Sequence, residues 1–219
     1  MLEKVQDPRY AAIAKPAEQV LGLLRRLLLT NDSPTVCEVG IGIGATSVEI
    51  CRLLDHKGII FFFDFAEKLE QLGKDLSDLG FQNFVMVGNE RKTFDSYAWN
   101  LGKLLLDNIR AGKNGLFDLV FLDGAHAFQY DAPAAVILKG LVKPGGVLIL
   151  DDYDWSFAVS PTMRPSVKPE ITNDYTHEQI EMSHVKFVCD LFFDPDPLFE
   201  KIDIGYGSKE HRRAYRRLG

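Results

Sequence analysis

Acidic side chains stand at the ends of two apolar stretches of the sequence. Asp151 and Asp152 follow directly on the run "VLIL", and Asp123 follows "FDLVFL". Ionised carboxylates are costly to remove from water, and neighbouring ones repel each other. A hard divalent cation such as Mg²⁺, which prefers oxygen ligands, would offset that repulsion. These residue types therefore predict a metal site at Asp123, Asp151 and Asp152.

Two simpler interpretations remain open for these carboxylates. Asp123 is a residue type that commonly caps the first turn of a helix. Asp151 and Asp152 also fit a solvated turn that holds no metal. Asp154 lies beyond the pair, at the start of a loop, and is expected to be a surface residue.

A glycine-rich segment, "GIGIGATS", is the second candidate site. Glycine lets the backbone approach a ligand closely, and the N–H groups that open a following helix are free to bind it. Gly40, Gly42 and Gly44 also fit the dinucleotide pattern G-x-G-x-x-G/A, with Ala45 last. A tight turn between a strand and a helix is the simpler explanation of the same spacing.

Two carboxylates near this loop narrow the choice of ligand. Glu38 comes two residues before the first glycine, where it would attract a cation. Asp64 follows "IIFFF", at the position where an acidic residue binds ribose hydroxyls. A pyrophosphate would be repelled by Glu38, whereas a cationic nucleoside such as S-adenosylmethionine (SAM) would be attracted.

Strand-like and helix-like segments alternate five times along the chain. The strands are expected at 34–40, 58–64, 81–88, 116–124 and 143–152, and the helices at 17–30, 46–54, 66–80, 96–112 and 130–141. Strands that are apolar on both faces are typical of a parallel sheet covered by helices on each side. The expected fold is therefore a doubly wound α/β sheet, in which ligands bind beyond the carboxyl ends of the strands.

The rest of the chain breaks this alternation. A proline-containing loop at 153–175 is expected to be a functional lid. One helix is expected at 177–192, and 198–218 is predicted to form two strands joined by a short turn. The whole chain, 1–219, is expected to be a single domain, in which 1–30 is an N-terminal helical segment.

Composition and charge point to an ordinary globular protein. The chain is 46% hydrophobic and 26% charged. Its net charge of −6 argues against a nucleic-acid partner, and the basic tail "KEHRRAYRRLG" is expected to protect an edge strand from aggregation. Three cysteines without paired spacing predict neither a disulfide framework nor a zinc site. Because no signal core or membrane-length apolar run is present, we expect a cytoplasmic protein with no membrane partner.

The motif "CEVGIGIGATS" resembles the first motif of the class I SAM-dependent methyltransferases, of the form E/D-x-G-x-G-x-G. "KPGGVLIL" resembles their segment entering the fifth strand, and the end of the chain resembles their antiparallel seventh strand. The resemblance implies a mostly parallel seven-stranded sheet with a C-terminal antiparallel hairpin, and SAM as cofactor. The SAM-binding positions that it implies are Glu38, Gly40, Gly42 and Gly44 at the methionine part, Thr46 in the same loop, Asp64 at the ribose, Gly88 and Asn89 at the adenine, and Asp123 at the far edge.

A narrower resemblance is carried by "FDLVFLDGAH" and "VLILDDYDW", which resemble the metal-dependent small-molecule O-methyltransferases of the catechol and macrolide-sugar types. It implies Mg²⁺ at Asp123, Asp151 and Asp152, and methyl transfer to a hydroxyl of a small-molecule acceptor. The position of the lysine base of the catechol branch is occupied here by His126. The expected catalytic residues are therefore His126 and Asp123.

Other functions remain open at this point. One is a nicotinamide (NAD or NADP) dependent oxidoreductase that uses the same glycine loop, although Glu38 and the carboxylates speak against it. Another is a non-catalytic or repurposed protein with the SAM-binding fold. Tyr130 and Trp155 are expected either to wall the acceptor pocket or to pack against other aromatic side chains. The sequence leaves open which acceptor is used and whether the chain forms a homo-oligomer.

Overall fold

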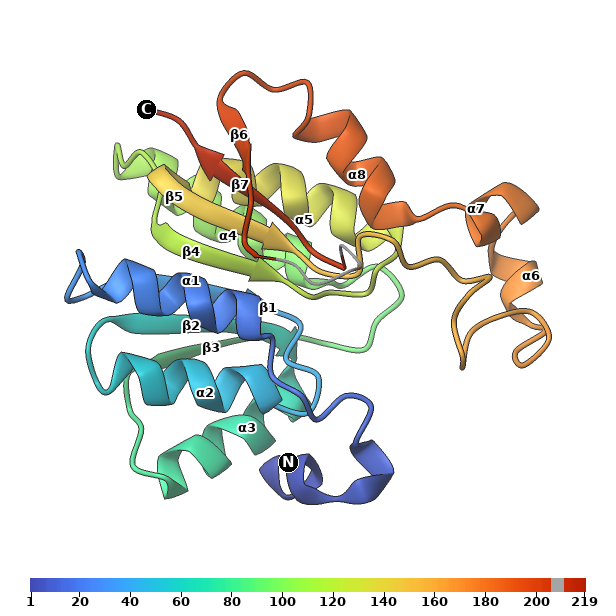
Figure 1. The fold of residues 1–219 in the computed structure, drawn as a ribbon, viewed down its shortest axis with the longest axis horizontal. Coiled ribbons are helices and arrows are strands. Elements are labelled where there is room, and N and C mark those ends of the chain that lie inside the picture. Colours follow the sequence, from blue (N-terminus) through green and yellow to red (C-terminus); the bar gives the residue numbers. More distant parts are fainter. Residues whose placement is uncertain (206–210) are drawn as a thin grey trace.

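A seven-stranded sheet in the order β3-β2-β1-β4-β5-β7-β6 forms the centre of the protein (Figure 1). The computed structural model describes residues 1–205 and 211–219. The strands are β1 (Thr35–Val39), β2 (Ile59–Phe65), β3 (Phe84–Asn89), β4 (Phe117–Leu122), β5 (Val142–Leu150), β6 (Phe199–Ile202) and β7 (Arg213–Arg217). The first five strands pair in parallel, and β7 pairs antiparallel with both β5 and β6. The predicted doubly wound, mostly parallel sheet is confirmed.

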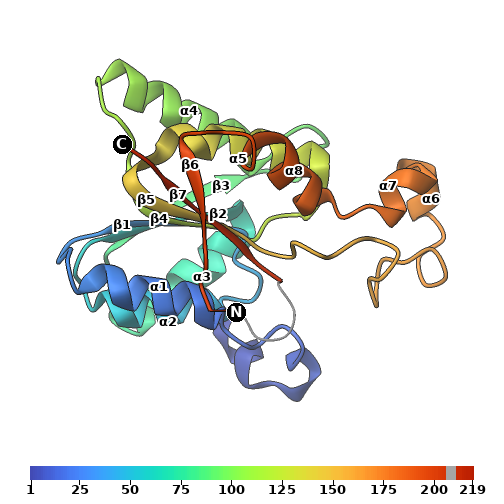
Figure 2. The same cartoon turned by 45° about the horizontal axis from the view of Figure 1, so that its top comes forward.

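Helices cover both faces of the sheet (Figure 2). The helices of the described residues are the short 3-10 helices η1 (Leu2–Gln6) and η2 (Pro8–Tyr10), and the α-helices α1 (Glu18–Leu28), α2 (Ala45–Leu54), α3 (Ala66–Asp78), α4 (Tyr97–Arg110), α5 (Phe128–Leu141), α6 (Ile171–Asp174), α7 (His177–Glu181) and α8 (His184–Phe192). One core lies between the sheet and α1, α2 and α3, and it contains Leu24, Ile50 and Leu72. The other lies between the sheet and α4, α5 and α8, and it contains Leu101 and Leu138. The alternating apolar pattern of the sequence is thus buried on both faces.

The chain winds outward in opposite directions from the centre of the sheet. It runs from β1 to β2 and β3 on one side, and from β4 to β5 on the other, while β1 and β4 are direct neighbours. Ligands of such folds bind in the crevice at the carboxyl ends of the strands where the order reverses. The ends of β1 and β4 are therefore the expected edges of a binding site.

The prediction of one helix at 177–192 is wrong, because the helix is broken into α7 and α8. Met182 between them is extended, at φ −81° and ψ 142°. The hydroxyl of Ser183 accepts a hydrogen bond from the backbone N–H of Lys186 (3.2 Å) and so begins a new helix. The same hydroxyl donates to the carbonyl oxygen of Tyr153, which anchors the break to the chain after β5.

The short turn that was predicted between the last two strands falls largely outside the described residues. β6 and β7 pair antiparallel as expected, with Ile202 opposite Ala214. However, ten residues, 203–212, separate the strands, and 206–210 lie outside the described residues. His211, just before β7, lies beside the chain that follows β5, since the N–H of Tyr153 donates to the carbonyl oxygen of His211 (2.8 Å).

An extension formed by 153–183, with α6 and α7, projects from the side of the domain (Figure 1). It has a small apolar cluster of its own, around Phe157, Ile171 and Ile180. Aromatic packing stabilises this cluster, because the ring of Phe157 lies against the rings of Tyr175 and His184. Among the described helices, none is long and apolar enough to cross a membrane.

Candidate active site

The backbone after β1 lies in direct contact with the backbone after β4. Gly40 has φ +85°, and a Cβ added there would lie 1.8 Å from the carbonyl oxygen of Asp123. Gly40 N–H donates to the Phe63 carbonyl (2.8 Å), and Asp123 N–H donates to the Val39 carbonyl (2.8 Å). A side chain at position 40 is thus excluded both by its conformation and by its neighbour. The close contact fixes the position of Asp123 relative to the glycine loop.

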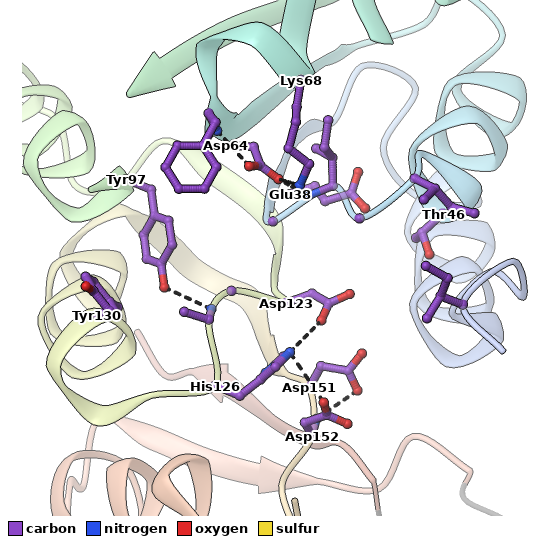
Figure 3. A pocket seen from close by; sticks show the side chains of 18 of the residues that line it. Glu38, Thr46, Asp64, Lys68, Tyr97, Asp123, His126, Tyr130, Asp151 and Asp152 are labelled. Atoms are coloured by element: carbon purple, nitrogen blue, oxygen red, sulfur yellow. Dashed lines mark hydrogen bonds and ion pairs between the residues drawn. The ribbon is translucent and has the colours of Figure 1, made fainter. Parts of the chain in front are cut away.

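A cavity of about 830 Å³ opens beside this contact, within the range of about 300–1,000 Å³ of small-molecule sites. One end lies at the glycine loop and the other at the carboxylates after β4 and β5 (Figure 3). Four residues of the N-terminal segment line it: Ala12, Ile13, Lys15 and Ala17. The other lining residues include Glu38, Thr46, Asp64, Asn89, Tyr97, Asp123, His126, Tyr130, Asp151, Asp152 and Arg212. The cavity therefore joins the two sites that the sequence predicts.

Two of the predicted SAM-binding glycines do not line this cavity. Gly44, at φ +86°, is the N-cap of α2, and a Cβ there would lie 2.8 Å from the side chain of Leu2. Gly88 lies within β3, where a Cβ would lie 2.7 Å from Cα of Ala66. Both glycines serve close packing of the backbone, whereas Gly40 and Gly42 face the cavity.

Two buried oxygen atoms of the cavity have no hydrogen-bond partner among the described residues, Oε2 of Glu38 and Oδ1 of Asn89. Burial raises the pKa of Glu38 to about 8, and the nearby charge of Asp64 acts in the same direction. Unpaired buried polar atoms are costly unless a ligand satisfies them. A cationic ligand with a hydrogen-bond donor fits this end of the cavity, because it would favour ionised Glu38 and supply the missing donors.

Asp64 is held by groups on both sides of the cavity. Its Oδ2 accepts a hydrogen bond from the N–H of Ile41 (3.0 Å). The same oxygen forms an ion pair with Nζ of Lys68 (2.6 Å). Thr46 lies at the start of α2, and its hydroxyl oxygen accepts a hydrogen bond from the N–H of Ala17 (3.0 Å). Thr46 thus ties the N-terminal segment to the glycine loop, and Asp64 and Lys68 present a paired acid and base to the cavity.

Asp123, Asp151 and Asp152 come together with His126 at the other end of the cavity (Figure 3). We call these four residues the carboxylate cluster. Nε2 of His126 lies 3.5 Å from Oδ1 of Asp123 and 3.3 Å from Oδ2 of Asp152. His126 and Asp152 both have positive φ, 53° and 54°, which is costly for residues with a side chain and is typical of functional sites. The predicted convergence of the three aspartates is confirmed in the structure.

Burial and mutual repulsion both favour the protonated form of carboxyl groups in this cluster. Burial raises the pKa of Asp123 well above its usual value, and the neighbouring Asp151 and Asp152 raise it further. A third of the Asp123 side chain is open to the cavity, so the group is confined by protein without being sealed from a ligand. Burial also raises the pKa of Asp152, against the effect of His126. At least one of these carboxyls is therefore disposed to hold a proton.

The structure contradicts the simpler interpretation of Asp123, and that of the pair for Asp151 but not for Asp152, whose side chain is 38% exposed. Helix α5 begins only at Phe128, with Ala127 as its N-cap, so Asp123 does not cap it. Asp151 is 7% exposed and is not part of a solvated turn.

The loop that carries His126 is held by a pair of buried side chains. The hydroxyl of Tyr97, on α4, donates to Oδ1 of Asp131, on α5. The N–H of Ala125 donates to the Tyr97 hydroxyl oxygen (3.2 Å). Burial raises the pKa of Tyr97 above its usual value, and it also raises that of Asp131. This pair is a positioning device for the loop 123–126.

The carboxylate cluster does not fit Mg²⁺ as the side chains stand. Within the described residues, no group of three or more His, Cys, Asp or Glu is arranged to hold a metal ion. Both oxygens of Asp151 are already engaged: Oδ1 accepts from the N–H of Asp152 (2.9 Å), and Oδ2 from the guanidinium of Arg212 (3.0 Å). A cation of the chain itself therefore pairs with Oδ2 of Asp151, one of the predicted ligand atoms.

The two aromatic residues near the acceptor end differ in position. Tyr130 lines the cavity. The ring of Trp155 lies 5.8 Å from that of His126 and 5.0 Å from that of Phe157. Of the described residues that line the cavity, none belongs to 153–175. Closure of this segment over an acceptor stays a prediction.

Sequence reasoning missed three residues of the site. Lys68 stands four positions after Asp64, a helical spacing that places the pair on one face. Tyr97 and Arg212 gave no such signal, because their partners Asp131 and Asp151 lie 34 and 61 residues away in the chain. Arg212 belongs to the basic tail, for which only protection of a strand edge was predicted.

Comparisons with known proteins agree with this geometry. The family described as methyltransferase domain matches residues 37–153, from β1 to the residue after the aspartate pair. No curated protein matches the sequence.

Several solved structures share the fold at low sequence identity. The O-methyltransferase TomG from Streptomyces achromogenes, involved in tomaymycin synthesis and solved with SAM, is 19% identical, with a TM-score of 0.63 over 100% of this chain and 89% of that chain. An O-methyltransferase from Bacillus cereus, solved with SAH, is 16% identical, with a TM-score of 0.58 over 99% of this chain and 90% of that one. The methyltransferase PaMTH1 from Podospora anserina, also bound to SAH, is 15% identical, with a TM-score of 0.58 over 91% and 78%.

Proposed function

Because this chain belongs to the methyltransferase domain family, we propose that it transfers the methyl group of SAM to a hydroxyl of a small-molecule acceptor. The observation that carries this proposal is the single cavity that joins the glycine loop to the carboxylate cluster. The O-methyltransferase TomG, which shares the fold, was solved with SAM, and this supports the choice of donor. The family assignment also favours a transferase over the oxidoreductase alternative.

The glycine-loop end of the cavity suits SAM. Gly40 and Gly42 allow the backbone to approach the ligand, and Glu38 offers a negative charge to the cationic methionine part. Asp64 and Lys68 are placed to hydrogen-bond the ribose hydroxyls, and the unpartnered Oδ1 of Asn89 is an acceptor for the adenine amino group.

His126 is the proposed base. When bound, SAM supplies the methyl group: the acceptor oxygen forms the new O–C bond as the C–S bond breaks. His126 takes the proton of the acceptor hydroxyl at Nε2, because histidine is the side chain that most often serves as a general base. Asp123 and Asp152, 3.5 and 3.3 Å from the same Nε2, stabilise the ring once this nitrogen is protonated. We therefore assign His126 and Asp123 to the acceptor end of the cavity.

The Mg²⁺ part of the sequence prediction is not included in this mechanism, since Arg212 engages Asp151. The cytoplasm remains the location that we propose, because the three cysteines, all in the described part of the chain, are free thiols.

Binding and turnover test the proposal separately. Calorimetry with SAM and SAH should show saturable binding, and NAD and NADP should show none. Asp64→Asn should weaken SAM binding by about tenfold or more, since one ligand-facing charge is lost. Asp78→Asn is the matched control, because Asp78 forms a similar pair with Lys74 (2.5 Å) on the exposed face of α3.

An acceptor panel followed by mass spectrometry should then reveal a product heavier by one CH₂ group. Binding of NADP in preference to SAM would contradict the proposal. Equal weakening of SAM binding by Asp64→Asn and Asp78→Asn would also contradict the proposal.

A further inference from the structure

We propose that the guanidinium of Arg212 is the resident cation of the carboxylate cluster, and that the protein transfers methyl groups without a divalent metal. The inference concerns the acceptor end of the cavity and rests on the function proposed above. It starts from a disagreement: the aspartates have the residue types and order expected of a metal site, yet their arrangement does not fit a metal.

Arg212 is built into the site by contacts on opposite sides. One terminal nitrogen donates to Oδ2 of Asp151 (3.0 Å), and the other donates to Oε1 of Gln19 on α1 (2.6 Å). The guanidinium carbon lies 5.8 Å from the ring centroid of Phe121, a buried residue of β4. The Arg212 side chain is 20% exposed and that of Asp151 only 9%. Three elements of the fold thus converge to hold one arginine against one aspartate.

This arrangement leaves Asp151 unavailable to a metal. Carboxylates that ligate a divalent ion commonly accept other hydrogen bonds, so the obstacle at Asp151 is the positive charge of its partner. Oδ2 of Asp151 is bound to Arg212, and Oδ1 accepts the N–H of Asp152 (2.9 Å). An ion at Asp151 would have to displace the guanidinium, whose positive charge would also repel it. Charged hydrogen bonds of this kind are among the stronger ones in proteins.

Arg212 also supplies what the cluster needs electrostatically. Asp123, Asp151 and Asp152 repel each other, and Arg212 favours the ionised form of Asp123 and of Asp152. His126 contributes positive charge only when it is protonated, whereas an arginine is always charged. Arg212 therefore keeps a permanent positive charge beside the place where the acceptor oxygen loses its proton to His126.

Its role is that of a positioning residue that acts through Asp151. The guanidinium lines the cavity, and its Nε has no hydrogen-bond partner among the described residues. No metal, oxidant or further reactant enters the step. The proton goes to His126, the O–C bond forms, and the C–S bond breaks with its electron pair left on sulfur.

Manganese binding provides a test that does not depend on turnover. The full chain, freed of metal by chelation, is titrated with Mn²⁺, and the free ion is followed by electron paramagnetic resonance. The variants are Arg212→Gln and, as matched control, Arg216→Gln. Arg216 lies on β7, the strand that begins just after Arg212, and it pairs with Glu200 (3.7 Å) at the surface. Wild type and Arg216→Gln should show no saturable binding. Arg212→Gln should bind Mn²⁺ saturably, with a Kd at least about tenfold below the highest concentration at which wild type shows no saturation, since the cluster loses its cation.

A second variant locates the ion. In Arg212→Gln combined with Asp151→Asn, the gained binding should disappear. Saturable Mn²⁺ binding by wild type that Asp151→Asn removes would overturn the proposal, and this measurement requires no arginine variant to fold. Equal Mn²⁺ binding by wild type and a folded Arg212→Gln would overturn it as well.

SAM calorimetry on the same samples separates the two proposals. If wild type fails to bind SAM, the proposed function fails, while the Mn²⁺ titrations still decide the role of Arg212. If SAM binds and wild type also holds Mn²⁺ at Asp151, only the inference about Arg212 fails.

Discussion

Gly40 and Asp123, which are distant in the sequence, meet so closely that a Cβ on Gly40 would lie 1.8 Å from the carbonyl oxygen of Asp123. One residue belongs to the loop assigned to SAM, and the other to the carboxylate cluster. Under the proposed function, their contact sets the distance between the methyl donor and the acceptor end of the site. Any substitution that pushes the two backbones apart should therefore lower both the stability of the fold and the rate of methyl transfer.

Gly40→Ala should lower the free energy of unfolding by about 3 kcal/mol or more, because the new methyl group collides with backbone that cannot move aside. Gly42→Ala is the matched control. Gly42 has a positive φ of 53°, but nothing lies within 4 Å of a Cβ there, so its cost should be about 1–2 kcal/mol. Chemical denaturation followed by circular dichroism measures both. Equal losses would mean that the contact with Asp123 is not a constraint.

The raised pKa of Glu38 predicts how stability changes with pH. Burial raises this pKa from 4.5 in the unfolded chain to about 8 in the folded protein. The protonated form of Glu38 is thus favoured in the folded protein. Its contribution to the free energy of unfolding is complete below pH 4.5 and is lost as the pH rises toward 8. Between these values the unfolding free energy should fall by up to about 1.4 kcal/mol per pH unit from this group. Glu38→Gln should remove that slope, as thermal denaturation across the pH range can check.

The same carboxyl should release a proton when SAM binds at neutral pH. A cationic ligand favours the ionised form of Glu38, which is mostly protonated in the free protein at pH 7. Calorimetry in buffers of different ionisation enthalpy should therefore show proton release for wild type and much less for Glu38→Gln. Identical proton release in both proteins would remove Glu38 from the SAM site.

His126→Gln should lower kcat by roughly 10²–10⁴, the usual contribution of a general base. SAM binding should remain unchanged, because His126 lies at the acceptor end of the cavity. Asp154→Asn serves as the control, since Asp154 is exposed on the loop just after the cluster. A fall in SAM affinity with no change in kcat would place His126 at the other end of the site.

Tyr97→Phe should lower the unfolding free energy by about 1–3 kcal/mol, because the carboxyl of Asp131 and the N–H of Ala125 both lose a hydrogen-bond partner. Since Ala125 precedes His126, kcat should fall as well. Tyr175→Phe is the matched control. It removes a tyrosine hydroxyl that accepts a hydrogen bond from the side chain of Gln129 (2.6 Å), and Tyr175 lies on the projecting extension. Its effect on kcat should be smaller, and equal effects of the two variants would show that Tyr97 does not position the loop.

The sequence determined the fold and the place of the site. Apolar strands and amphipathic helices repeat with local periods, and the carboxyl ends of parallel strands must meet at one edge, so Glu38, Asp64, Asp123 and Asp151 could be placed without coordinates. Gly44 and Gly88 were assigned to SAM because glycine marks any close approach of backbone. Whether a glycine lines a cavity, as Gly40 and Gly42 do, or lies only against protein, as Gly88 does, depends on how the strands pack.

Only the tertiary structure decided what compensates the aspartates. Arg212 reaches Asp151 across 61 residues of chain, because β7 inserts beside β5 and brings the preceding residues to the carboxyl end of the sheet. Hydrophobic periodicity reports which face of an element is buried. It carries no information on which distant charge will lie opposite a given carboxylate, and that pairing separates a metal site from an arginine-paired one.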